Sequence, residues 1–292
     1  MNPLIKQLTL RPSKAPNLPI APVDYDQRYL DQLLNALRLY FAQVDNFEQA
    51  LSNINGGGSL LSFPYFSAYQ DGITTLTAAI PNSTSTAAIQ VASTADFPSS
   101  GYLIIDQEII SYTTKTATTF DGTITRGVLG TTSGKSSHAI GAYVTEAQGS
   151  GVGTSASMVI RTVTATNAIT CTIPDSKIYV ANSGLYNIQF SAQFLNYTTS
   201  VDNVTVWLRQ NGVDVAASAG VVTVPSQHGT TAGAIIAGWN YVNQFNAGDY
   251  FELYWASDSG NTVIATYPKG TSPTRPESPG LILTVTFVSA VA

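Results

Sequence analysis

The sequence contains few of the residues from which catalytic and metal-binding sites are usually built. Among its 292 residues there is one cysteine, Cys171, and there are two histidines, His138 and His228. A single cysteine excludes an intrachain disulfide and a zinc site made of several thiolates. Neither histidine belongs to an HExxH motif or follows a nucleophile-elbow pattern. We therefore expect no catalytic residues, no metal and no cofactor, and we expect Cys171 to be a buried thiol in a strand.

Charged residues are scarce as well. Only 11% of the residues are Asp, Glu, Lys or Arg, compared with about 25% in an average soluble domain. The net charge of −5 argues against a nucleic-acid partner, because phosphate binding needs clustered Lys and Arg. The polar surface must come from Thr, Ser, Asn and Gln, and the abundance of Thr, β-branched and aromatic residues favours β-structure. So few charges are common in proteins that bury much of their surface against copies or partners.

Long apolar runs are absent. The N-terminus lacks the apolar segment of about 7–15 residues that a signal peptide carries, and no stretch approaches the roughly 18 apolar residues of a membrane-spanning helix. We therefore expect a soluble protein that is made in the cytoplasm and does not insert into membranes.

Two carboxylates, Asp106 and Glu108, lie two positions apart in a segment expected to be a strand, so that they would share one face. Paired carboxylates can catalyse glycoside hydrolysis. A solvated strand face is the simpler interpretation, and it is the one we adopt.

Residues 1–23 are expected to form an extended arm. Prolines at positions 3, 12, 16, 19 and 22 each remove a backbone donor, so no helix or sheet can run through the segment. Such an arm is either solvated or lies on another protein, and its apolar and basic side chains favour the second interpretation. The expected docking residues are Leu4, Ile5, Lys6, Leu8, Arg11, Lys14, Leu18 and Ile20.

One long helix is predicted over 24–55. Asp24 and Gln27 have the spacing of a capping box, and glycines at 56–58 end the helix. Apolar residues recur at alternating steps of three and four, as in a coiled coil. A helix that covers a domain core shows the same stripe, but the glycines separate this helix from any domain, which favours self-association. The expected oligomerisation positions are Leu30, Leu33, Leu37, Tyr40, Val44, Phe47 and Leu51.

The remaining chain is predicted to be mainly β, in four parts: an aromatic connector at 56–71, a small β-domain at 72–148, a Gly-rich linker at 149–154 and an antiparallel β-domain at 155–292. Within the last part, hydrophobic and polar residues alternate over 186–194, which is typical of a strand with one face in a core. Further strands are predicted around 204–208, 251–255 and 281–287, and Asn211-Gly212 is a strong hairpin signal. Strands at this spacing without helices indicate a sandwich or jelly roll.

The C-terminal part resembles the trimeric jelly-roll superfamily of C1q and tumour-necrosis-factor modules, in the form found on phage fibres. The resemblance lies in residues 183–191 (SGLYNIQFS), 207–212 (WLRQNG) and 245–253 (FNAGDYFEL). It implies a homotrimeric knob over 155–292. The eukaryotic modules follow collagen and a signal peptide, which this sequence does not contain, and this favours a virus over an extracellular immune protein.

Two further resemblances cover the rest of the chain. Residues 105–112 (IDQEIISY), 125–131 (TRGVLGT) and 138–144 (HAIGAYV) are similar to a β-module of phage structural proteins. Residues 11–19 (RPSKAPNLP) and 35–41 (NALRLYF) are similar to the start of fibre-like proteins of marine and cyanobacterial phages.

These resemblances imply a non-enzymatic virion protein, a homotrimeric fibre on the tail, neck or head that docks to other virion proteins through its N-terminal arm. A capsid decoration protein is the alternative, and a polysaccharide depolymerase is a weaker third one. The loops of the knob are expected to contact a host-surface glycan or protein, because loops on a rigid scaffold often carry recognition. The same residues would otherwise close the trimer interface; they are Tyr197, His228, Tyr267 and Arg275, all expected to be exposed.

Overall fold

The computed structural model describes residues 17, 18, 24, 26–52, 63–82, 87–131, 136–173 and 175–290, with the backbone alone for 47–52. The chain divides into two compact units, residues 1–63 and 64–292. Of the docking residues expected in the N-terminal arm, only Leu18 is among the described residues, and its side chain is exposed. The other seven lie outside them.

The first unit contains the helix α1, Gln27–Ser52, which confirms the predicted helix. The helix is capped by Asp26 instead of Asp24: the Asp26 Oδ1 atom accepts a hydrogen bond of 2.9 Å from the backbone N–H of Arg28. This contact satisfies one of the N–H groups that the first turn leaves without a helical partner. The cap therefore lies two residues later than the capping-box spacing predicts.

The second unit is mainly β, as predicted, and its two large sheets pack face to face. All strand pairs with a defined register are antiparallel. The first sheet has twelve strands: β1 (Tyr65–Gln70), β2 (Ile73–Thr75), β4 (Gly101–Ile105), β5 (Glu108–Tyr112), β8 (Thr125–Arg126), β9 (Tyr143–Gly149), β11 (Thr162–Asn167), β14 (Gly184–Asn196), β18 (Gly233–Ala237), β19 (Asn240–Phe245), β21 (Thr262–Ala265) and β24 (Leu281–Ser289).

The second sheet has seven strands: β10 (Ala156–Ser157), β12 (Ile169–Thr172), β13 (Lys177–Val180), β15 (Asp202–Gln210), β16 (Val213–Asp214), β17 (Gly220–Val224) and β20 (Tyr250–Ser257). Two small sheets complete the unit; they contain β3 (Ile89–Gln90), β6 (Thr114–Lys115) and β7 (Thr119–Asp121), and β22 (Gly270–Thr271) and β23 (Thr274–Arg275).

The long strand β14 shows how the sequence pattern produces the core. Successive side chains of a strand point to opposite faces. Every second residue of β14 from Tyr186 to Phe194 is buried between the two sheets, against residues such as Leu208 and Trp255 of the second sheet. The predicted hairpin is also present, with Asn211 and Gly212 both at positive φ in the turn between β15 and β16. Cys171 lies in β12 as predicted, but it is half-buried, and burial raises the pKa of its thiol to about 11.

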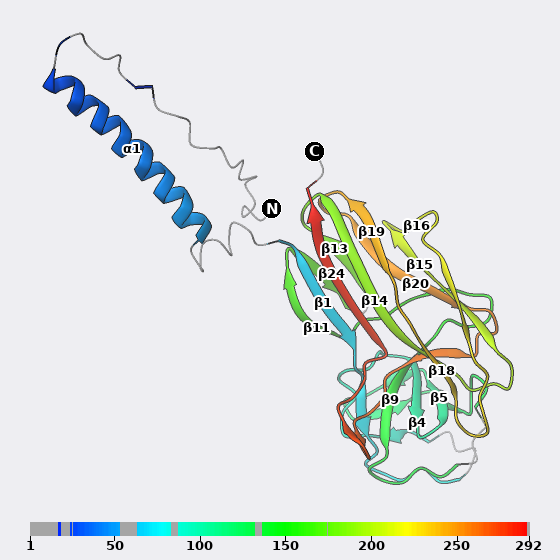
Figure 1. Ribbon diagram of the computed structural model, residues 1–292. Helices are drawn as coiled ribbons and strands as arrows, with labels where there is room; N and C mark the ends of the chain where they lie inside the picture. The colour runs from blue at the N-terminus through cyan, green and yellow to red at the C-terminus, as the bar shows by residue number, and fades with distance from the viewer. Residues whose placement is uncertain are drawn as a thin grey trace. The chain divides into compact units, whose positions relative to one another are not determined.

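The structure differs from the predicted division into a connector, a small β-domain, a linker and a knob. Strand β1, from the expected connector, pairs with β24 along its whole length. Strand β9 pairs with β21, which makes one continuous sheet of the two expected domains (Figure 1). The expected linker at 149–154 is a hydrogen-bonded turn in which the buried Ser150 Oγ accepts a 3.0 Å bond from the N–H of Ser257. A Gly-rich composition is compatible with a fixed turn as well as with a flexible linker, so composition alone did not distinguish the two.

Candidate functional site

The β4–β5 hairpin turn carries two acidic residues, Asp106 and Glu108. Asp106 and Gln107 form the turn, and Glu108 pairs with Ile105 as the first residue of β5. Asp106 has a φ of 54°, in the left-handed region that Asp tolerates better than most residues. The carboxylate of Asp106 is 61% exposed, whereas that of Glu108 is buried. The expectation that both carboxylates lie on a solvated strand face is therefore wrong for Glu108.

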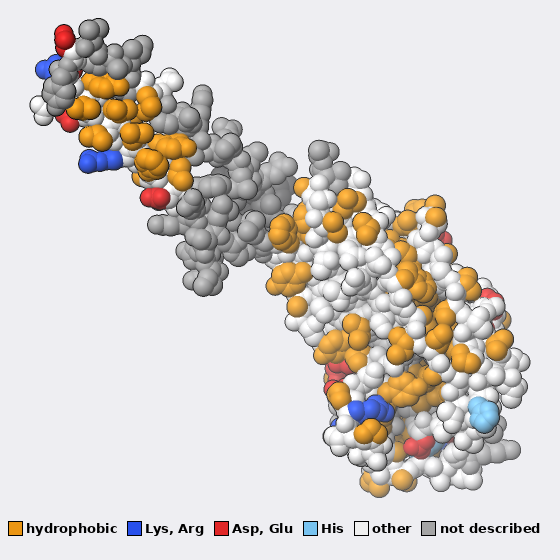
Figure 2. Space-filling model, viewed as in Figure 1, with side chains coloured by type: hydrophobic (Ala, Val, Ile, Leu, Met, Phe, Trp, Pro, Cys, Tyr) orange, Lys and Arg blue, Asp and Glu red, His pale blue; other side chains and the backbone are white. Residues whose placement is uncertain are grey.

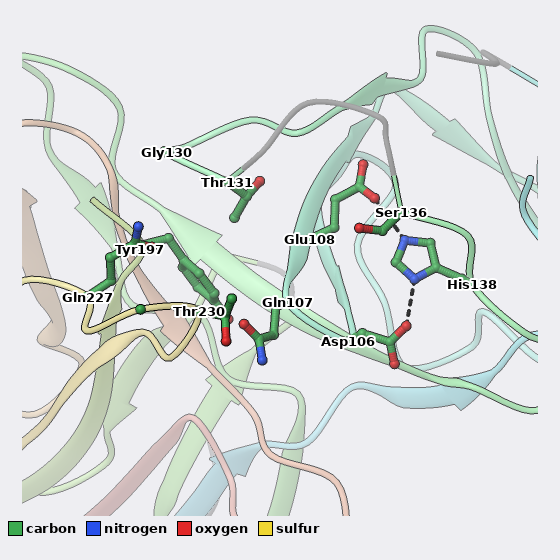
Figure 3. A pocket seen from close by; sticks show the side chains of 11 residues that line it. Asp106, Gln107, Glu108, Gly130, Thr131, Ser136, His138, Tyr197, Gln227 and Thr230 are labelled. Carbon is green, nitrogen blue, oxygen red and sulfur yellow. Dashed lines mark hydrogen bonds and ion pairs between the residues drawn. The ribbon is translucent and has the colours of Figure 1, made fainter. Parts of the chain in front are cut away.

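His138 joins these two carboxylates. Its backbone is fixed by two hydrogen bonds of 2.9 Å with Ile80, and only 1% of the residue is exposed. The imidazole lies 2.7 Å from Asp106 through Nδ1 and 2.8 Å from Glu108 through Nε2 (Figure 3). Burial disfavours the charged imidazole, but the hydrogen bonds to Glu108 and Asp106 outweigh it, so the pKa of His138 is raised. In the charged form both ring nitrogens donate to a carboxylate.

Arg126 completes the cluster on the other side of Glu108. It donates from Nε to Oε1 at 2.9 Å and from Nη2 to Oε2 at 2.6 Å, a bidentate pair in which both side chains are buried. Arg126 also donates to the carbonyl oxygens of Pro81 and Ser136. Burial raises the pKa of Glu108, but the hydrogen bonds from His138 and Arg126 outweigh it and lower that pKa overall.

The charges of this cluster balance when His138 is protonated, since two carboxylates then face two cations. Balance matters because an unpaired charge in a buried site is costly, while a paired and fully hydrogen-bonded one is tolerated. We call Asp106, Glu108, Arg126 and His138 the charge cluster. Both nitrogens of His138 are engaged by carboxylates, so neither is available to activate a hydroxyl group as in a serine-histidine pair. The geometry suits a role in positioning Asp106.

Three members of the charge cluster, Asp106, Glu108 and His138, form one wall of a hollow of about 470 Å³. Figure 3 shows Asp106, Glu108 and His138 on one side of it and Tyr197, Gln227 and Thr230 on the other. The remaining lining residues are Gln107, Gly130, Thr131, Ser136 and Gly229. Within the described part of the chain, no group of three or more His, Cys, Asp and Glu residues is arranged to hold a metal ion.

The four loop residues predicted to contact a ligand do not meet at one site. Tyr197 lines the hollow, but it is only 6% exposed, because its ring packs in an apolar cluster with Ile104 and Leu195. Burial raises the pKa of its hydroxyl. Tyr267 is half-buried against the same cluster and lies outside the hollow. The prediction of exposed rings is thus wrong for Tyr197 and only partly right for Tyr267.

His228 and Arg275 are exposed, as predicted. His228 neighbours the lining residues Gln227 and Gly229 but does not line the hollow itself. Arg275 lies in β23 and donates to the carbonyl oxygen of Pro268 at 3.3 Å. Of the four predicted residues, only Tyr197 lines the hollow, and the sequence interpretation did not bring Asp106, Glu108, Arg126 and His138 together. The signal for the cluster was two acids enclosed by isoleucines, at 104–110, in a chain with few charges.

The expected oligomerisation positions lie along α1. Leu33, Leu37, Tyr40 and Val44 are half-buried, and Leu30 is exposed. The side chains of Phe47 and Leu51 lie outside the described residues.

No protein-family model and no curated protein sequence matches this chain. Among the described residues, no helix combines the length and the apolar character needed to cross a membrane.

Proposed function

We propose that this chain is a structural, non-enzymatic protein of a phage particle, a homotrimeric fibre on the tail, neck or head. Its residues 1–23 dock to other virion proteins, α1 forms a three-stranded coiled coil, and the sheets of the second unit form a jelly roll of the C1q and tumour-necrosis-factor type. The resemblances described for the sequence motivate this proposal. The central element of the proposal is assembly of the chain with copies of itself. The observation that supports this assembly is the outer face of the first sheet.

Six neighbouring strands of the first sheet contain no charged residue: β1, β11, β14, β18, β19 and β24. Their side chains away from the core are uncharged polar groups interspersed with apolar ones. In one row across the sheet, Tyr65 pairs with Thr286, Thr286 with Asn187 and Asn187 with Val242. Figure 2 shows hydrophobic and uncharged polar atoms over β1, β24 and β14. We call this surface the uncharged face.

Depletion of charged residues distinguishes the buried centre of a protein interface from ordinary surface. Several apolar side chains on the uncharged face are largely exposed in the single chain, among them Val242 at 59% and Ile236 at 66%. The outer face of the second sheet differs, since Lys177, Arg209 and Glu252 lie on it. The contrast supports burial of the first sheet, and not of the second, against another copy.

The helix supports the same proposal. Leu34, Leu39 and Phe41 are at least half exposed in addition to the apolar stripe. A single helix in water gains little stability by itself and normally depends on packing of its apolar face. Association of three copies would supply that packing for both α1 and the uncharged face.

The test is the mass of the purified chain measured by light scattering. We expect about three times the monomer mass of 30.9 kDa. A stable monomer at micromolar concentration would contradict the proposal, and a particle that assembles with normal appendages when this protein is deleted would contradict the fibre assignment.

A further inference from the structure

We infer that the hollow beside the charge cluster is a binding site for a neutral carbohydrate, such as a sugar unit of a host-surface polysaccharide. This inference rests on the proposed role in host contact and assigns it a site and a ligand class. It begins from the size and the construction of the hollow. At about 470 Å³ it falls within the range of small-molecule sites. Its walls are loops and a turn carried on the continuous first sheet, the usual placement of recognition residues.

The lining offers both hydrogen-bond donors and acceptors. Gln107, Gln227 and Thr230 have side chains that form no hydrogen bond with any of the described residues. Amide and hydroxyl groups each donate and accept, which matches the hydroxyl groups of a sugar. An apolar ligand would cover these groups without replacing the hydrogen bonds that water gives them, and this costs free energy.

The electrostatics of the hollow favour a neutral ligand over a charged one. None of the described residues that line it is Lys or Arg. Asp106 and Glu108 line it, and the cations nearest to them, Arg126 and His138, hold these same carboxylates. An anionic ligand would lie next to the exposed carboxylate of Asp106. No lysine or arginine among the described lining residues would compensate the charge of that ligand. A cationic ligand would find both carboxylates already bonded, Glu108 to Arg126 and His138, and Asp106 to His138.

The walls of the hollow are fixed before any ligand arrives. His138 holds the exposed carboxylate of Asp106 and is held in turn by Glu108. On the opposite wall, the N–H of Gln227 donates to the carbonyl oxygen of Thr198 at 2.8 Å, and His228 and Thr231 bond each other in both directions. Asn196, fully buried, ties the same loops together through the carbonyl oxygens of Ser200 and Pro225. Rigid walls lower the entropy lost on binding, which matters for a weak ligand such as a single sugar.

The charge cluster holds the carboxylate of Asp106 at the wall of the hollow, where a ligand can reach it. A buried, charge-balanced cluster is a costly way to hold one exposed side chain, and apolar residues would fill the same space as well or better for stability. A carboxylate that accepts hydrogen bonds from two neighbouring hydroxyl groups makes strong, directional contacts with a sugar. The ring of Tyr197 adds an apolar wall next to these polar groups.

The experiment uses the full-length chain and saturation-transfer NMR with methyl glycosides of glucose, galactose, mannose, rhamnose and N-acetylglucosamine. Glucuronic acid and sialic acid serve as anionic comparison probes. We expect transfer to at least one neutral glycoside and none to the acids. Asp106→Asn and Thr230→Val, which change opposite walls, should each weaken binding about tenfold, as loss of one good hydrogen bond does. Glu277→Gln and Thr271→Val, both exposed and outside the lining, should leave it unchanged.

Three outcomes would overturn the inference: no transfer to any neutral glycoside, transfer to the acids alone, or binding that Asp106→Asn and Thr230→Val both leave intact. Failure here is separable from failure of the proposed function. A trimeric chain that attaches to host cells but binds none of the glycosides refutes the carbohydrate site and leaves the fibre proposal standing. A chain that binds a glycoside at this site but is monomeric refutes the fibre proposal alone.

Discussion

His138 and Glu108 lie 30 positions apart in the sequence, and their side chains, both almost fully buried, meet at 2.8 Å. The contact joins the start of β5 to the segment before β9 and makes the exposed Asp106 part of a rigid structure. Because Glu108 also carries the bidentate bond from Arg126, the stability of this region and its presentation of Asp106 are coupled. Mutation and pH should therefore affect both.

Replacing His138 by alanine should destabilise the second unit by about 3 kcal/mol, because removal of one member of a buried ionic cluster leaves a carboxylate under-compensated. The measurement is denaturant unfolding of the purified chain. His228→Ala is the matched control, since His228 is exposed, and its effect should stay within about 0.5 kcal/mol. Equal effects of the two substitutions would show that the charge cluster contributes no net stability.

The charge cluster should also give the stability a defined dependence on pH. The pKa of His138 is raised above 6.5 in the folded state, so its contribution is complete below that pH and is lost as the pH rises through the raised value. The pKa of Glu108 is lowered below 4.5, so its contribution is present above that pH and is lost as the pH falls through the lowered value.

Other acids titrate in the acidic range, and burial raises the pKa of both Glu146 and Glu252. The informative quantity is therefore the difference in free energy of unfolding between the native chain and His138→Gln. This difference should be largest near neutral and mildly acidic pH and should shrink in alkaline solution. A difference that stays constant from pH 6 to pH 10 would mean that the folded protein does not hold His138 in its charged form.

A lysine placed on the uncharged face should disrupt the assembly. Val242→Lys and Ile236→Lys would each bury a charge in every copy, at a cost of at least about 2 kcal/mol per site. We expect light scattering to show dissociation at concentrations where the native chain is trimeric. Val213→Lys, at an exposed position of β16 in the second sheet, is the control and should remain trimeric. Unchanged mass for all three variants would exclude the uncharged face as an interface.

Charged residues in the apolar stripe of α1 should weaken the proposed coiled coil. Leu37→Lys and Val44→Lys would place charges where the helices are expected to meet, and the loss should amount to several kcal/mol. The thermal transition of the helix, followed by circular dichroism, should move to lower temperature, while the second unit should remain trimeric. Gln32→Lys and Gln43→Lys, on exposed positions outside the stripe, serve as controls. If they shift the transition as much as the stripe variants do, the helices do not meet along the stripe.

Deletion of residues 1–23 should separate assembly from attachment. The arm contains no predicted helix or strand, so its removal should leave a soluble trimer. An arm that becomes ordered only on contact binds weakly by itself, and three copies would supply the affinity through avidity. The shortened protein should no longer co-purify with assembled particles. Its normal incorporation would place virion docking elsewhere in the chain.

Elements specified by local periodicity could be predicted from the sequence. The alternation in β14, the Asn211-Gly212 turn and the stripe of α1 each depend on residues within a few positions of one another. The abundance of Thr, β-branched and aromatic residues is likewise a property of the sequence itself, and it predicted the mainly β fold that the structure confirms. The helix cap was predicted to within two residues. The sequence offers Asp24 and Asp26, and the hydrogen bond from the Arg28 N–H identifies Asp26 as the cap.

Pairings between distant segments were decided only by the tertiary structure. The pairing of β1 with β24 and of β9 with β21 joins parts of the chain that composition had divided. The sequence analysis placed Glu108 with Asp106 on a solvated strand face and did not connect either residue to His138, because burial and long-range partners arise from contacts that no local pattern encodes. The uncharged face required the strand registers, since they determine which side chains of six separate strands lie together. Local patterns determine which face of an element is apolar, and long-range packing determines what that face meets.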